Sequence, residues 1–209
     1  MNAHPERGIG RRGFAILALA ALVGGCAGLQ PPGEVQSLHV LAAGPVPRTK
    51  GARQDLVLEV AAPRAGPGFD TVRMAWVRRA YELDYFAAHR WVDTPSRMLG
   101  PLLVGALEQS GGFRAVTQAQ GAVRADLRLD SEIVRLQQDF SVQPSREELA
   151  LRVQLTDVRE RRVIATRLFE EVEDAPSDDP VGGVIAANAA LQRLLQQVAD
   201  FCIAEAPRR

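Results

Sequence analysis

An alternation of apolar and charged residues between positions 124 and 133 constrains the fold more than any other feature of this 209-residue sequence. Its period of two is that of a β-strand with one face in a core and the other in water. The pattern holds as far as Ile133 and then slips by one residue, resuming at Val134. Because such a slip moves every later side chain to the opposite face, it predicts a β-bulge at this point.

Shorter strands are predicted on both sides of this segment. The segments 149–155 and 163–172 are joined by a charged turn over 157–162, and this short connection favours an antiparallel hairpin. The segment 63–68 is rich in proline and glycine and is predicted to be a loop. The other predicted strands span residues 37–41, 55–60 and 71–77.

A first helix is predicted over about residues 94–110. Thr94 is placed to act as the N-cap, with Pro95 at the first helical position, where its missing N–H does no harm. Gly111–Gly112 is a typical helix end. The pair Gly100–Pro101 interrupts the helical periodicity, so it predicts a kink or a break there.

A second helix is predicted over about residues 180–206, with Asp179 as its N-cap. On one stripe of this helix, Cys202 is expected to be a small buried hydrophobic residue, and Asn188 to bond the backbone of a neighbouring loop rather than a ligand. The residues of that stripe are Val184, Asn188, Leu191, Leu195, Val198 and Cys202. Together these patterns predict a single α+β domain over residues 37–209. We expect one mixed, largely antiparallel sheet packed against two main helices.

The first 25 residues have the organisation of a secretory signal peptide. Basic residues precede an apolar run over residues 14–23, which is too short to span about 30 Å of hydrocarbon as a helix. A signal anchor with an incidental cysteine is the alternative interpretation. The segment Val23–Cys26 resembles the lipobox of bacterial lipoproteins, in which the cysteine thiol receives lipid and becomes the mature N-terminus. Residues 26–36 then form the lipidated cysteine and its tether.

The residues around this segment also bear on localisation. Ala27 follows Cys26, where an aspartate favours retention in the inner membrane, so we expect a lipid-anchored protein on the periplasmic face of the outer membrane. The segment 11–14 is similar to the twin-arginine export pattern, and the export route stays open. With Cys26 lipidated, only Cys202 remains, so an intrachain disulfide is not expected.

Several functional classes are not expected from the composition. Basic and acidic residues balance at 25 each, whereas a nucleic-acid-binding domain has a basic excess. His39 and His89 stand apart in the sequence without metal-ligand spacing, and nothing marks Ser110 or Ser131 as a nucleophile. No glycine-rich phosphate loop follows a strand. We therefore expect no catalytic residues, no cofactor and no metal, and a protein that is not an enzyme.

Aromatic residues concentrate in one short stretch, and two interpretations stay open. The rings either fill the space between the sheet and the first helix, or some of them line a pocket or a partner-binding surface, where Tyr and Trp are favoured. The stretch contains Trp76, Tyr81, Tyr85, Phe86 and Trp91.

The same region resembles the ABC-type transport auxiliary lipoproteins. The resemblance lies in the segments Phe69–Met74 and Tyr81–Phe86, and most specifically in Trp91–Leu99. It implies a non-enzymatic periplasmic component of a mammalian-cell-entry-type lipid transport system, whose permease and ATPase subunits are separate proteins. Its implied partners are the membrane and those transporter subunits, and ring-forming partners would favour weak self-association. Two alternatives stay open, namely a carrier that binds phospholipid in its own apolar pocket and a structural lipoprotein of the cell envelope.

Overall fold

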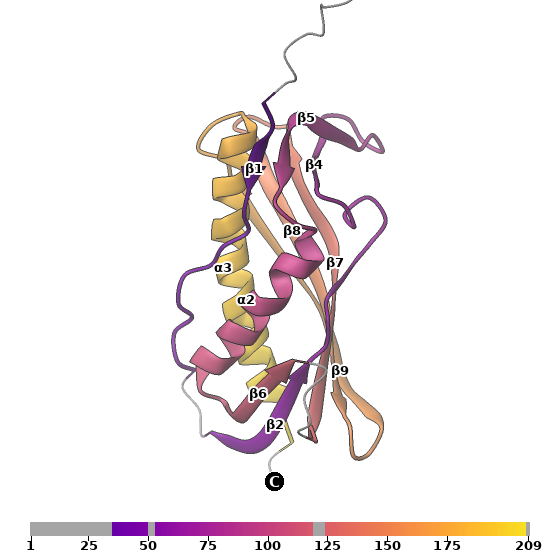
Figure 1. The fold of residues 1–209 in the computed structure, drawn as a ribbon, viewed down its shortest axis with the longest axis vertical. Coiled ribbons are helices and arrows are strands. Elements are labelled where there is room, and N and C mark those ends of the chain that lie inside the picture. The colour runs from indigo at the N-terminus through magenta and orange to yellow at the C-terminus, as the bar shows by residue number, and fades with distance from the viewer. Residues whose placement is uncertain (1–34, 50–52, 119–123, 208–209) are drawn as a thin grey trace, which may run out of the picture. The chain divides into compact units, whose positions relative to one another are not determined.

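The computed structural model describes residues 35–49, 53–118 and 124–207. The predicted signal peptide and Cys26 lie outside these residues, as does most of the tether. The elements are, in chain order, β1 (Ser37–His39), β2 (Gln54–Val60), β3 (Arg64–Ala65), β4 (Arg73–Val77), β5 (Asp84–Trp91), α2 (Pro95–Ser110), β6 (Phe113–Gln118), β7 (Leu127–Asp139), β8 (Arg146–Asp157), β9 (Arg162–Asp174) and α3 (Pro180–Glu205) (Figure 1).

The long strand β7 organises the sheet. Along one of its edges it pairs in succession with β2, β3 and β4, all parallel to it, and along the other edge it pairs with antiparallel β8. β9 continues the sheet beyond β8, β6 flanks β2, and β5 and then β1 flank β4. The sheet is therefore mixed, and its two longest ladders, β7–β8 and β8–β9, are antiparallel. Together with the two helices it confirms the predicted α+β class.

Helices α2 and α3 contribute to one hydrophobic core with the strands they cover. The core joins buried leucines of β2, β7 and β8 to leucines of both helices, among them Leu103 of α2 and Leu194 of α3, which are fully buried. Charged side chains on the other face of β7 pair with their neighbours, as Arg128 does with Glu59 at 2.8 Å. The alternation in the sequence thus separates a core face from a solvent face.

The bulge and the hairpin are both confirmed. The β7–β8 register shifts between Ile133 and Arg135, where the alternation slips in the sequence. The hairpin pairs Asp157 of β8 with Arg162 of β9, and the pairing continues along both strands to Arg146 and Asp174. The slip is therefore accommodated as one extra residue in β7, which keeps its apolar residues in the core on both sides of the bulge.

Helix α2 begins and ends where the sequence predicts, with two corrections. Thr94 occupies the N-cap position, but its Oγ1 lies 3.2 Å from Ser96 Oγ and makes no capping hydrogen bond. The helix also runs through Pro101 as one element, so of the predicted kink or break the break is wrong. Packing offsets the missing hydrogen bond: Leu103 is fully buried, and a Cβ on Gly100 would lie 3.4 Å from Pro63. Gly111 ends the helix in the left-handed region, at φ 69°.

Helix α3 confirms three predictions. Asp179 is the N-cap, and its Oδ1 accepts a hydrogen bond from Gly182 N at 2.8 Å. Asn188 bonds the chain that follows β1: its Oδ1 accepts from Ala42 N at 2.9 Å. Cys202 is fully buried, and burial raises the pKa of its thiol. The thiol is therefore a packing group rather than a reactive one.

Three strands were not predicted. β3 lies inside the predicted loop 63–68, and it pairs through only two residues with β7. The sequences of β5 and β6 lack a regular alternation of apolar and polar residues, because neither strand has one face fully buried and the other fully exposed. β4 begins at Arg73, so the first residues of its predicted range lie outside it.

Candidate functional site

The topology brings the ends of several elements together at one end of the domain, which we call the aromatic end. β4 and β7 are parallel and finish there at Val77 and Asp139, which are paired with each other. Asp139 is paired in turn with Arg146 at the start of β8, and Arg146 with Asp174 at the end of β9. Helix α3 starts at the same end, at Pro180, in the upper part of Figure 1.

Three rings form a cluster at this end, which we call the aromatic patch: Trp76 on β4, Phe86 on β5 and Phe140 just after β7. Their centroids lie 6.1 to 6.2 Å apart, and Phe140 meets both other rings edge to face. The exposed Arg78 lies over two of them, with its guanidinium carbon 5.3 Å from the Trp76 centroid and 5.8 Å from that of Phe140. All three rings are half-buried, so the patch caps the core and also presents aromatic surface to solvent.

The five aromatic residues singled out in the sequence therefore separate. Trp76 and Phe86 join the patch, whereas Trp91 is buried in the core with 4% of its surface exposed. Tyr85 lies beside the patch but outside its ring cluster: its ring stacks under Arg73 at 3.8 Å, and its hydroxyl donates to Gly68 O at 3.0 Å. Tyr81 is fully exposed in the β4–β5 turn. Trp91 therefore fills the core, whereas a role of the other aromatic residues in a pocket or partner surface stays a prediction.

Phe140 is the member of the patch that the sequence did not reveal. It follows β7 and lies far along the chain from the aromatic stretch. Only the parallel pairing of β4 with β7, which sets Val77 beside Asp139, brings Phe140 to Trp76. In the sequence, the one feature that could have pointed to Phe140 was its position as a large apolar residue directly after a long strand with several charged residues.

The two histidines, which stand apart in the sequence, are neighbours in the fold. The parallel pairing of β1 with β5 places His39 Nε2 2.9 Å from His89 Nδ1, with the rings stacked 5.2 Å apart. His89 also meets Phe86 edge to face, so the pair extends the patch towards β1. Burial, and secondarily the charge of His89, lower the pKa of His39. The pair therefore favours a state in which one ring is neutral and accepts a hydrogen bond from the other.

Carboxylates border the patch at the start of α3. Asp178 Oδ1 accepts a hydrogen bond from Ser145 N at 2.6 Å, and this bond lowers the pKa of Asp178. The bond from Gly182 N lowers the pKa of Asp179 in the same way. Both groups are therefore ionised at neutral pH and are engaged in fixing the loop before α3.

The surface beside the patch is hollowed into an open depression of about 400 Å³. The depression is lined by Trp76, Tyr85, Phe86, Phe140 and the segment 178–180. Open on one side and bordered by two ionised carboxylates, it resembles a contact surface more than an enclosed ligand site.

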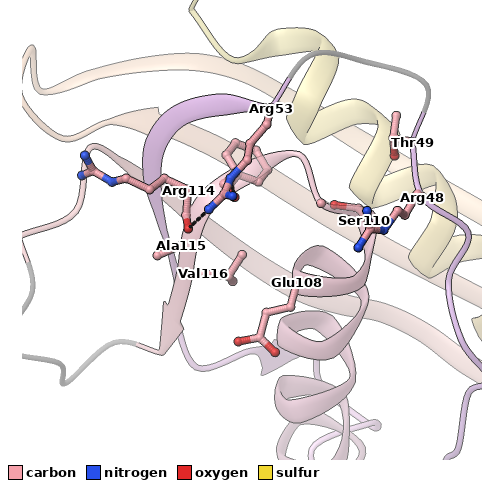
Figure 2. Close-up of a pocket in the computed structure, with 10 residues that line it drawn as sticks. Arg48, Thr49, Arg53, Glu108, Ser110, Arg114, Ala115 and Val116 are labelled. Atoms are coloured by element: carbon pink, nitrogen blue, oxygen red, sulfur yellow. Dashed lines mark hydrogen bonds between the residues drawn. The ribbon is translucent and has the colours of Figure 1, made fainter.

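A second pocket, of about 710 Å³, lies where α2 ends and β6 begins, and it is basic (Figure 2). Two of its arginines are already engaged. Arg53 Nη2 donates to Arg114 O at 2.7 Å, and Arg114 Nη1 donates to Asp55 Oδ1 at 3.3 Å. Glu108 adds a negative charge to the lining. These contacts leave the pocket poorly suited to an anion, so the aromatic end is the stronger candidate.

Within residues 35–49, 53–118 and 124–207, no three His, Cys, Asp or Glu side chains come together in a group that could hold a metal ion. In the same part of the chain, no helix has both the length and the apolar character needed to cross a membrane.

Among the solved structures with a similar fold, two show the range of similarity. A protein from Xanthomonas campestris is 22% identical, with a TM-score of 0.74 over 81% of this chain and 95% of its own. A hypothetical protein from Chlamydia trachomatis is 10% identical, with a TM-score of 0.52 over 74% of this chain and 98% of its own. No protein of curated function matches the sequence. At these identities, the structures support the fold alone.

The family is shown by the sequence itself. The model of a family described as the ABC-type transport auxiliary lipoprotein component matches residues 39–199. That range is most of the chain and includes every element from the end of β1 to most of α3. The resemblance found in the segments 69–74, 81–86 and 91–99 is thereby confirmed, and the chain belongs to the ABC-type transport auxiliary lipoproteins.

Proposed function

We propose that this lipoprotein is a non-enzymatic component of a mammalian-cell-entry-type lipid transport system and docks the complex at the outer membrane. The family is one of ABC-type transport auxiliary lipoproteins. Cys26 follows a signal-like segment and is the residue that receives the lipid in this proposal. Ala27 after it favours the outer membrane.

The observation that carries docking, rather than lipid carriage, is the filled space between the sheet and the helices. Leu58, Leu127 and Leu155 from the strands are fully buried, as are Leu103 and Leu194 from the helices. A carrier needs a continuous apolar cavity for acyl chains, and leucine side chains occupy that layer here. A filled core leaves surface contact as the better-supported mode of action.

The aromatic patch is the proposed contact surface. Half-buried rings held by one another, such as Trp76 and Phe140, lose little side-chain entropy when a partner covers them. Arg78 lies over them and supplies a charged group that can pair with the partner as well. Tyr, Trp and Arg are the residue types that most often dominate the energy of protein interfaces.

A charge reversal at the patch tests the proposal. Arg78 is exposed and its side chain lies over the rings, so Arg78→Glu should leave the fold intact and weaken the contact. Arg161→Glu is the matched control, because Arg161 is also exposed but lies in the β8–β9 turn at the opposite end. The measurement is pull-down of the purified mammalian-cell-entry subunit without nucleotide. We expect Arg78→Glu to reduce capture about tenfold or more and Arg161→Glu to leave it unchanged.

Equal capture by both variants would remove the patch from the interface, and absence of capture by the unaltered protein would refute docking. Circular dichroism of both variants confirms that each is folded. Hydrolysis of lipid esters or phosphates by the purified protein would contradict its assignment as a non-enzyme.

A lipid carrier is the second candidate, because one groove is mainly apolar. The groove lies between the end of β2 and the first turns of α2 and has a volume of about 520 Å³. Its apolar lining includes Val60, Pro63, Gly100 and Pro101. Extraction of phospholipid from vesicles by the purified protein, in the absence of the ring subunit, would favour this function over docking.

A further inference from the structure

Three exposed apolar side chains project from two turns at the aromatic end, and we call them the tip. Tyr81 and Leu83 lie in the β4–β5 turn, and Val142 lies in the β7–β8 turn. Their exposed fractions are 107%, 36% and 38%. The two turns are neighbours because β4 and β7 are paired up to Val77 and Asp139.

Tyr81 has a backbone conformation that folding alone does not explain. Its φ is +68°, in the left-handed region that favours glycine, and a bulky side chain there is strained. It lies in a four-residue turn closed by the hydrogen bond from Glu82 N to Arg79 O at 3.2 Å. The ring gains no burial in return, since it is fully exposed. Strain held without a packing gain is typical of a functional position.

The charged groups around the tip are of both signs, and several of them are held by contacts within the protein. Arg79 pairs with Glu82 at 3.3 Å, and Arg78 lies over the rings of the patch. Asp178 is held by Ser145 N. Asp84, at the start of β5, is also exposed. The tip itself consists of three uncharged side chains, so it is suited to apolar contact with the interface of a bilayer rather than to electrostatic attraction.

The lipid anchor lies within reach of the same end. β1 runs parallel to β5 with Ser37 beside His89, so Asp84 lies five residues, or about 17 Å, closer to the tip than Ser37 does. The chain from Cys26 to Ser37 contains eleven peptide links and extends at most about 38 Å. The tether is therefore long enough for the tip to touch the membrane that holds the anchor.

We propose that the tip inserts into the headgroup region of the bilayer to which Cys26 is anchored and so fixes the orientation of the domain. Tyrosine is favoured at that depth because its ring is apolar and its hydroxyl stays hydrated. The anchor confines the tip near the surface, so even weak insertion becomes populated through effective concentration. The inference rests on the lipid anchor of the proposed function, and it places the aromatic patch beside the membrane, where a transport complex would arrive.

The test compares one position at the tip with its counterpart at the far end of β8. Val142 and Val158 are both 38% exposed and lie in the two opposite hairpin turns of this strand. Val142→Cys and Val158→Cys are each labelled with a fluorophore in the full lipidated protein. Cys202 is fully buried and Cys26 carries lipid, so the introduced thiol is the one that reacts. Both proteins are reconstituted in vesicles of phosphatidylethanolamine and phosphatidylglycerol that contain nitroxide-labelled phospholipid.

We expect quenching of the fluorophore at position 142 to exceed that at position 158 about threefold or more, with little dependence on salt. Tyr81→Gly, which removes the ring and relieves the backbone strain, should lower the quenching at position 142 while the protein stays folded and lipidated. Equal quenching at the two positions overturns the inference. If the fluorophore at position 142 becomes shielded from solvent only after the mammalian-cell-entry subunit is added, the inference is also overturned, because the tip is then a protein interface.

Capture of that subunit by the Tyr81→Gly protein separates the two proposals. Retained capture with lost membrane contact supports both the docking function and the insertion of the tip. Retained capture with equal quenching at positions 142 and 158 refutes insertion alone. Loss of capture together with unchanged quenching refutes insertion as well, since Tyr81 then serves the partner rather than the membrane.

Discussion

Glu147 should make the protein less stable as the pH rises. Its side chain shares the core-facing side of β8 with Leu149 and Leu151, and only 4% of the residue is exposed. Burial, and secondarily the charge of Glu148, raise the pKa of Glu147 well above its ordinary value of 4.5. Directly across the ladder lies Gln138, whose buried Oε1 has no hydrogen-bond partner. Glu147 is therefore favoured in its protonated form. As cross-strand neighbours, Glu147 and Gln138 are close enough to interact.

The sign follows from proton binding. Above pH 4.5 the unfolded chain loses the proton of Glu147 while the folded protein keeps it, so the free energy of unfolding falls as the pH rises. The slope reaches at most about 1.4 kcal/mol per pH unit, at pH values where the unfolded chain has lost the proton and the folded protein still holds it. Glutamine has the same shape and no charge to lose. We therefore expect Glu147→Gln to become more stable than the unaltered protein as the pH rises above 4.5, by no more than about 1.4 kcal/mol for each pH unit.

Urea unfolding of both proteins between pH 4.5 and 7 measures this difference. Glu148→Gln is the matched control on the neighbouring residue, because Glu148 Oε1 is paired with Arg146 at 3.3 Å on the solvent face. Losing that pair should lower the stability at neutral pH slightly, which is the opposite sign. If Glu147→Gln is no more stable than the unaltered protein at pH 6.5, or if both show the same pH slope, the buried carboxyl is not protonated and the reasoning is wrong.

Three further predictions concern the anchor, the core and the helix α3. Cys26→Ala should abolish labelling with radioactive fatty acid and release the protein from the membrane fraction; labelling that persists would refute the assignment of a lipoprotein. Trp91→Ala should lower the free energy of unfolding by about 3–5 kcal/mol, as measured by urea denaturation, because the ring is 4% exposed in the core. A change below about 1 kcal/mol would mean that the site repacks. Gly183→Ala should destabilise the protein by about 1–3 kcal/mol, since the new Cβ would lie 2.4 Å from buried Gln138 Oε1, whereas Gly105→Ala in α2 should stabilise it by about 0.5–1 kcal/mol. Thermal melts of the two glycine variants that shift in the same direction would contradict this account.

Local patterns in the sequence predicted the elements whose shape depends on nearby residues. The bulge after Ile133 was readable because a period of two leaves no freedom to absorb an extra residue without exposing the core face. The start of α3 was readable because Asp179 satisfies a free N–H of the first turn, a contact between residues three apart. The resemblance to the family was likewise most specific in a contiguous segment, Trp91–Leu99, which lies within the range 39–199 that the family model matches.

The tertiary structure decided what depends on pairing between distant strands. β5 and β6 lack a regular alternation, and their partners β1, β4 and β2 are chosen by the global topology rather than by neighbouring residues. The helix continues through Pro101 because packing outweighs one missing hydrogen bond. The contact of His39 with His89, and the arrival of Phe140 at Trp76, likewise required parallel strands that are remote in the chain. Periodicity reports which face of a strand is buried, whereas the identity of the strand beside it is set by the fold as a whole.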